Sequence, residues 1–215
     1  MFPANFKAMK QYADYLLLLS PGEHVKKIVK EHKLHAANII GKYESMHSIA
    51  HISIKKMPRQ KAFISKPALM ALNKSLHTLP PITLTIDGFD YFNHGDDYKT
   101  IYARLRSNHI TTLWFKTLKK HLTIKEFMVP HITIARNIPV AQFNKLWPHF
   151  KAINWVENFT VDVLTVLQRE TFATFATWEP FIKLPFEARH LVEPAAPKHA
   201  PLKTVNMHNG QISLF

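Results

Sequence analysis

The sequence contains no cysteine and only five glycines, and these two shortages remove several kinds of chemistry. Without cysteine there can be no disulfide, no thiolate nucleophile and no cysteine-based zinc site. The glycines are not clustered, so we expect no glycine-rich loop around a phosphate, and the motifs H-E-x-x-H, G-x-S-x-G and G-x-x-x-x-G-K-[ST] are all missing. Any catalysis must therefore use histidine, hydroxyl or charged side chains.

Long hydrophobic runs are also missing. The longest one, Tyr15 to Leu19, is far too short to span a bilayer and lacks the flanks of a signal peptide. We therefore expect a soluble, cytoplasmic protein with no membrane partner, and the lack of cysteine fits a reducing compartment. At 215 residues with 47% hydrophobic content, the chain is long enough to bury a sizeable core.

Acidic residues are scarce, because 15 Asp and Glu face 28 Lys and Arg and leave a formal net charge of +13. This excess favours anionic partners such as RNA, DNA or phosphate esters. A solvated basic surface would give the same charge balance. The lysines predicted to lie on such solvated helix faces are Lys26, Lys27, Lys30, Lys33, Lys116, Lys119 and Lys120.

Hydrophobic periodicity and turn residues predict an α+β fold in which strands and helices alternate. A loop is expected after the first helix and through Gly41, and Asn108 is expected to cap the third helix. Strands are predicted at about 12–19, 48–55, 82–92, 100–106, 127–136, 159–168 and 178–184, and helices at about 21–32, 67–79, 108–122 and 139–150.

Two of the predicted strands carry the same short pattern. His51-Ile-Ser53-Ile and His131-Ile-Thr133-Ile each place a histidine and a hydroxyl residue on one face of a strand and two isoleucines on the other. One such pair would be an ordinary half-exposed sheet face. Two pairs in matching contexts favour two polar walls of one active site.

The two halves of the sequence correspond when one is shifted by about 80 residues, and each half reads as helix, histidine strand, helix, strand, strand. In this alignment residues 101–105 correspond to 180–184. A duplicated unit packs naturally about a pseudo-two-fold axis, which would set the two histidine faces across one cleft. Coincidence of element order is the alternative, because α+β domains commonly alternate in this way.

The paired motifs resemble those of the 2H phosphoesterase superfamily, in particular its 2′-5′ RNA ligase-like / RNA 2′,3′-cyclic phosphodiesterase branch. The segment F-M-V-P-H-I-T-I-A-R, from Phe127 to Arg136, is similar to the F-x-P-H-x-T-L-A-R signature of that branch, and the first motif departs from the pattern only in having Ser53 where threonine is commoner. The resemblance covers about residues 12–186. It implies a duplicated two-lobe fold with two antiparallel sheets flanking a central cleft and helices outside, formed by residues 1–186.

The resemblance also implies a reaction. The family opens 2′,3′-cyclic phosphate ends, or 2′-5′ linkages, of RNA or a small nucleotide without a metal or cofactor, and the reverse reaction is ligation. In-line attack on phosphorus needs a base for the water and an acid for the leaving oxygen, and histidine can fill either role near neutrality. His51 and His131 are therefore the predicted catalytic residues, and the sequence leaves open which one is the acid.

The residues predicted to hold the phosphate come from the same two motifs. Ser53 and Thr133 share a strand face with their histidines and can donate hydrogen bonds to the non-bridging oxygens. Arg136 is the cation that the motif suggests, although strand alternation puts it on the opposite face from His131 unless the strand ends or bulges. Lys55 is a second candidate cation, because alternation puts it on the face of the first histidine.

Two aromatic residues are candidates for stacking on a nucleobase, namely Tyr102 and Phe181. Aromatic side chains at such strand positions also serve as core residues. The pattern does not separate the two roles.

From residue 187 onward the sequence has neither helical nor strand periodicity, which predicts a flexible tail over 187–215. Its end, Q-I-S-L-F, resembles the bacterial sliding-clamp-binding peptide, in which Gln211 would bind at the pocket edge and Leu214 and Phe215 would fill the pocket. Alternatively, the end folds back on its own domain. The tail gives a second functional hypothesis, a module that binds RNA ends or nucleotides and is tethered to the bacterial DNA sliding clamp.

Overall fold

The protein is described here from a computed structural model, which describes residues 12–126 and 129–191. No helix in these ranges is long and apolar enough to cross a membrane. In chain order the elements are β1 (Tyr12–Leu19), α1 (Glu23–Ile40), β2 (Ile52–Lys61), α2 (Ala62–Leu76), β3 (Ile82–His94), β4 (Tyr98–Leu105), α3 (His109–His121), β5 (His131–Pro139), α4 (Val140–Ala152), β6 (Val156–Val161), β7 (Val163–Glu170) and β8 (Glu179–Pro185).

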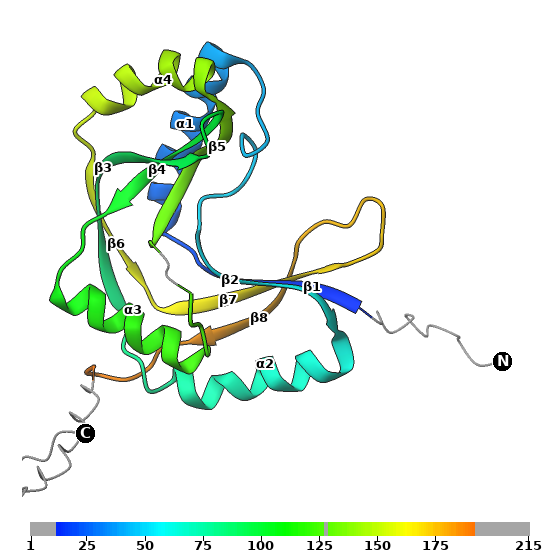
Figure 1. The fold of residues 1–215 in the computed structure, drawn as a ribbon. Helices are drawn as coiled ribbons and strands as arrows, with labels where there is room; N and C mark the ends of the chain where they lie inside the picture. Colours follow the sequence, from blue (N-terminus) through cyan, green and yellow to red (C-terminus); the bar gives the residue numbers. More distant parts are fainter. Residues whose placement is uncertain (1–11, 127–128, 192–215) are drawn as a thin grey trace, which may run out of the picture.

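The strands form two four-stranded antiparallel sheets, which confirms the predicted fold class. Sheet A has the order β2-β1-β7-β8 and sheet B has the order β5-β4-β3-β6. Helices α1 and α4 pack on sheet B, and α2 packs on the outer face of sheet A (Figure 1). The apolar side chains of β1 include Tyr15, Leu17 and Leu19, which are fully buried because β1 lies inside sheet A.

The duplication is visible in the order of the strands. In each sheet the histidine strand is at an edge and pairs with the strand that precedes it by one helix, namely β1 for β2 and β4 for β5. The repeated unit is therefore strand, helix, histidine strand, helix. The predicted match of residues 101–105 with 180–184 was wrong, because β4 occupies the place of β1 and β8 is the far edge of sheet A. The linear order of elements does not encode which strands pair.

The single strand predicted at 159–168 is two strands in the structure. Strand β6 pairs with β3 in sheet B, and β7 pairs with β1 in sheet A, so the chain crosses between the sheets at Asp162. The crossing is held by a hydrogen bond of 2.8 Å from the Phe186 amide to the Asp162 carbonyl. The phase of the apolar alternation changes at this point, since Phe159 and Val161 are buried before it and Leu164 after it.

The first helix is longer than predicted. It continues to Ile40 and ends at Gly41, whose φ of 81° lies in the left-handed region that glycine tolerates. The loop expected before Gly41 is therefore helical. This extra length carries Lys33 into the protein interior, where its side chain is 2% exposed, so its prediction as a solvated lysine was wrong.

Helices α3 and α4 begin at or next to their predicted starts, whereas α2 does not. Asn108 caps α3 as predicted, because its side chain accepts from the Thr111 amide while the Thr111 hydroxyl accepts from the Asn108 amide. Helix α2 starts at Ala62 rather than Pro67, which lies inside it. Residues beyond the predicted domain boundary still contact the domain, since the Ala188 amide donates to the Leu79 carbonyl at 3.1 Å.

Candidate active site

The two histidines have the same local geometry. His51 comes directly before β2 and His131 begins β5. Each Nδ1 lies 2.7 Å from the carbonyl oxygen two residues earlier, that of Ile49 for His51 and that of Val129 for His131. A carbonyl oxygen can only accept, so Nδ1 carries the proton in both rings. Each Nε2 is then the nitrogen that can accept or donate a proton in a reaction.

Both histidine strands also bulge at the same place. The β1–β2 pairing skips Ile54 and the β4–β5 pairing skips Ile134, each three residues after its histidine. A bulge shifts the strand alternation by one residue. Arg136 could share the face of the second histidine only if the strand ended or bulged, and the bulge at Ile134 meets this condition.

The bulges also bring a residue that the sequence reasoning missed. Lys56 and Arg136 both stand five residues after a histidine, and both line one cavity of about 1190 Å³. Lys55, the predicted cation, also lines this cavity, but its Nζ donates to the Leu122 carbonyl at 3.0 Å, at the end of α3. The equal count from each histidine could have identified Lys56 if the bulge had been foreseen.

The cavity has the cleft-facing side of sheet A as one wall. His51 and Ser53 line it, whereas His131 and Thr133 are not among its lining residues. Arg136 therefore connects the cavity to the second histidine strand. Other residues that line the cavity are Leu16, Leu18, Thr165, Leu167, Trp178 and Lys183.

Burial and nearby positive charge favour the neutral form of both histidines, because they lower the pKa of each ring. Burial lowers the pKa of His51, and the charges of Lys33, Arg136 and His131 lower it further against an opposing hydrogen bond to Ile49. Burial also lowers the pKa of His131, and Arg136 adds to this effect. The charge of His131 thus acts on His51, and that of Arg136 acts on both rings.

Aromatic residues fix the ring of His131. Phe92 and Tyr102 lie 5.0 and 5.1 Å from it between ring centroids, and they stack on each other at 4.2 Å. Tyr102 is only 5% exposed. Burial and its hydrogen bond to Asp90 raise the pKa of the Tyr102 hydroxyl to about 12. Tyr102 therefore supports the second histidine, and one of its faces is already stacked on Phe92.

Phe181, the other predicted stacking residue, is not brought to the cavity. Its ring lies 5.6 Å from that of Tyr15, and the Lys66 ammonium lies 5.8 Å from its centroid. Lys66 belongs to α2. Phe181 therefore packs on the side of sheet A that α2 covers, opposite to the cavity.

The buried Lys33 organises the loop that leads into His51. Its Nζ donates to the Ser45 carbonyl at 3.1 Å and to the carbonyl and hydroxyl of Ser48, both at 2.7 Å. The Ser45 hydroxyl in turn accepts from the Arg136 amide at 2.9 Å. Burial, with Arg136 nearby, lowers the pKa of Lys33 to about 8. One buried lysine thus connects the loop before the first motif to the bulged end of the second.

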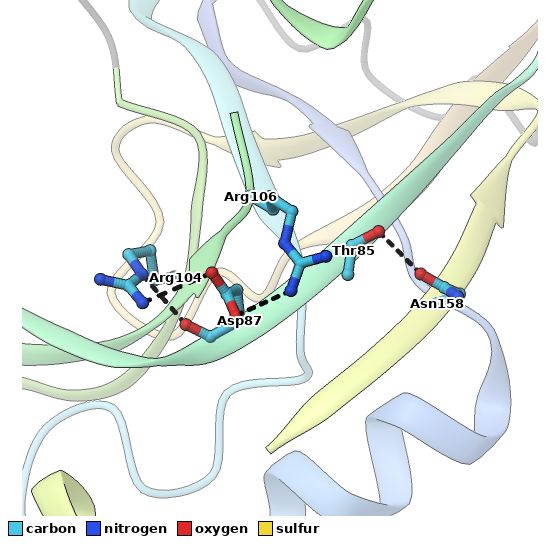
Figure 2. A network of polar contacts seen from close by, with 5 residues as sticks. All are labelled: Thr85, Asp87, Arg104, Arg106 and Asn158. Carbon is cyan, nitrogen blue, oxygen red and sulfur yellow. Dashed lines mark hydrogen bonds and ion pairs between the residues drawn. The ribbon is translucent and has the colours of Figure 1, made fainter. Parts of the chain in front are cut away.

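The strands of sheet B carry a separate polar network (Figure 2). Asp87 accepts from Arg106 at 3.1 Å and from Arg104 at 3.5 Å, and the Thr85 hydroxyl donates to Asn158 at 2.7 Å. The hydrogen bond from Arg106 is the main reason that the pKa of Asp87 is low. Arg104 stands opposite the second histidine in the β4–β5 pairing, with part of its charge neutralised by Asp87.

Within residues 12–126 and 129–191, no group of three or more His, Asp or Glu side chains is arranged to hold a metal ion. The predicted clamp-binding residues Gln211, Leu214 and Phe215 lie outside the described part of the chain. Tethering to a sliding clamp therefore stays a prediction.

Two antiparallel sheets, each with a histidine strand at its edge, define a duplicated 2H phosphoesterase architecture. The model of the 2′-5′ RNA ligase superfamily matches residues 29–171, and the chain belongs to this superfamily of phosphoesterases and ligases. None of the curated proteins compared with the chain matches it.

Solved structures share the fold at low sequence identity. The protein TT0787 of Thermus thermophilus superposes with a TM-score of 0.60 at 16% identity, covering 82% of this chain and 100% of that one. LigT of E. coli complexed with 3′-AMP gives 0.53 at 14% identity, covering 81% and 98%. LigT complexed with phosphate gives 0.51 at 13% identity, covering 82% and 98%.

Proposed function

We propose that this protein is a metal-independent phosphodiesterase that opens 2′,3′-cyclic phosphate ends of RNA by two-histidine acid–base catalysis. The observation that carries the proposal is the repeated histidine geometry. Each Nδ1 is held on a backbone carbonyl at 2.7 Å, which leaves each Nε2 to exchange a proton with the substrate. Solved complexes of LigT with 3′-AMP and with phosphate support a nucleotide phosphate as the ligand of this fold.

The reaction conserves every atom and proton. The Nε2 atom of one histidine takes a proton from water while the water oxygen attacks phosphorus. The second, protonated histidine gives its Nε2 proton to the departing 2′ or 3′ oxygen as that P–O bond breaks. The products are a phosphomonoester and a free ribose hydroxyl. The two histidines end with exchanged protonation states, and solvent restores them. An attack by a ribose 5′-hydroxyl in place of water would join two RNA ends.

Residues of both motifs stabilise the negative charge of the phosphate. In this proposal Ser53 and Thr133 donate hydrogen bonds to the non-bridging oxygens, and Arg136 and Lys56 offset the negative charge. The guanidinium of Arg136 can bind two oxygens at once, whereas Lys56 acts as a point charge. Lys55, bonded to the Leu122 carbonyl, is the weaker donor of the two lysines.

The test is hydrolysis of an oligoribonucleotide that ends in 2′,3′-cyclic phosphate, measured in excess EDTA. His51→Ala and His131→Ala are each expected to lower kcat by about 100- to 10,000-fold, the usual contribution of a positioned acid or base. His47→Ala is the matched control, because His47 is exposed and four residues away.

Either of two results would contradict the enzyme proposal. Strict dependence on an added metal would rule out the two-histidine mechanism. Binding of the oligonucleotide without turnover, with affinity unchanged in both variants, would instead favour the binding-module hypothesis.

A further inference from the structure

The connection between β7 and β8 places three aromatic side chains within residues 171–178. Phe175 is 93% exposed and Phe172 is 66% exposed, while Trp178 is half-buried. Single exposed aromatics are ordinary on protein surfaces, but a cluster on one hairpin indicates a contact surface. In Figure 1 this hairpin rises from sheet A on the side away from α2.

Arginine side chains lie over two of these rings. The Arg59 guanidinium carbon is 5.6 Å from the centroid of Phe172, and that of Arg169 is 4.8 Å from the centroid of Trp178. Tyr12 adds an edge contact to Phe172 at 5.8 Å. The hairpin thus carries the rings of two arginine–ring pairs, and both kinds of group stack well on nucleobases.

A buried carboxylate holds this arrangement in place. Asp14 Oδ2 accepts from Arg169 Nε at 2.9 Å, and Asp14 Oδ1 accepts from the Arg59 amide at 2.8 Å and the Thr171 hydroxyl at 2.9 Å. The side chain of Asp14 is only 5% exposed. These contacts tie the Arg169 side chain, the Arg59 backbone and the start of the hairpin to β1, so this part of the surface is held in place without a ligand.

The surface continues the floor of the cavity. Asp14 and Leu16 alternate to the same face of β1, Leu16 lines the cavity, and Asp14 pairs across the sheet with Arg169. Trp178 itself lines the cavity, together with Lys56 and His51. One face of sheet A therefore runs without interruption from the first histidine to the aromatic hairpin.

We propose that Arg59, Arg169, Phe172, Phe175 and Trp178, which we call the aromatic ledge, bind the upstream bases of a single-stranded RNA whose 3′ end lies in the histidine cleft. The proposal rests on the proposed function, because the cleft fixes which end of the strand is held. It makes a polynucleotide the substrate in preference to a small cyclic nucleotide. Stacking on aromatic faces tolerates any base sequence, and the net charge of +13 suits a phosphate backbone.

The ledge is tested by the length dependence of RNA binding to the full chain. Fluorescent oligoribonucleotides of about 2 and about 8 nucleotides, each ending in a 3′-phosphate, are titrated by anisotropy. The longer RNA is expected to bind more tightly to the wild type. Phe172→Ala and Phe175→Ala are each expected to reduce this gain by about tenfold.

Phe63→Ala is the matched control, because Phe63 is 61% exposed on α2 and lies outside the ledge. It is expected to keep the full gain. The Phe175 variant guards against misfolding, since removing a side chain that is 93% exposed leaves no cavity. A wild type that binds both lengths equally, or two ledge variants that keep the full gain, would overturn the proposal.

The experiments distinguish failure of the ledge proposal from failure of the enzyme proposal. If no cyclic phosphate end is hydrolysed but the gain with length is lost in the ledge variants, the ledge stands and the proposed reaction is wrong. If hydrolysis proceeds in EDTA and neither binding nor rate changes with RNA length, the reaction stands and the ledge is wrong.

Discussion

The two histidine strands share their backbone and differ in their surroundings. Each has a histidine held on a carbonyl at 2.7 Å, a bulge three residues later and a cation five residues later. Around His51 are an open cavity and the loop held by Lys33. Around His131 are the stacked rings of Phe92 and Tyr102.

The difference shows what a duplicated unit keeps and what it changes. Both strands share the backbone features that present Nε2, which in the proposed mechanism set where a proton is exchanged. The neighbouring side chains differ, so one histidine faces the cavity and the other is fixed by packing.

After the histidines themselves, the largest effect is expected at Arg136, one of the two equivalent cations. Arg136→Ala should lower kcat/KM for cyclic-ended RNA by about 100-fold or more, since Arg136 lines the cavity and acts on both histidines. Lys56→Ala should cost about tenfold, because a lysine offers a point charge without the two-point geometry of arginine. Steady-state kinetics on both variants measures the two losses. A larger loss for Lys56→Ala would reverse the roles assigned to the two strands.

A smaller effect is expected at Lys33, which is fully buried, whereas Lys119 of α3, which donates to the Glu126 carbonyl ahead of the second histidine, is only half-buried. Lys33→Met should lower the free energy of unfolding by about 2 kcal/mol, because the carbonyls of Ser45 and Ser48 lose their buried donor. Urea denaturation measures this loss. Lys30→Met is the matched control, since Lys30 is exposed on the same helix. Equal stability of the two variants would mean that the Lys33 contacts do not hold the loop.

The smallest effect is expected at the hydroxyl residues. Ser53→Ala and Thr133→Ala should each lower kcat/KM by about tenfold, the value of one hydrogen bond to a charged oxygen. Thr133→Ser should restore most of the activity, because it returns the hydroxyl. If serine at this position were as slow as alanine, the threonine methyl group rather than its hydroxyl would be what matters.

The sequence was sufficient for the features that depend on local pattern. The alternation of His131, Thr133 and their isoleucines predicted the strand, and the cap at Asn108 predicted the start of α3. The features that depend on pairing were not predictable. The bulge at Ile54, which brings Lys56 to the cavity, is defined by the register with β1. In the sequence Lys33 looks like any other lysine of an amphipathic helix. It is buried because residues 45–48, which come later in the chain, fold over it.

The pH dependence of kcat/KM, measured in excess EDTA on an oligoribonucleotide ending in 2′,3′-cyclic phosphate, tests the two-histidine mechanism most directly. One histidine must be neutral and the other protonated, so the rate should fall on both sides of a maximum. Burial lowers the pKa of both rings below 6.5, which places that maximum below pH 6.5. A profile with only one limb, or a maximum above neutrality, would contradict the mechanism.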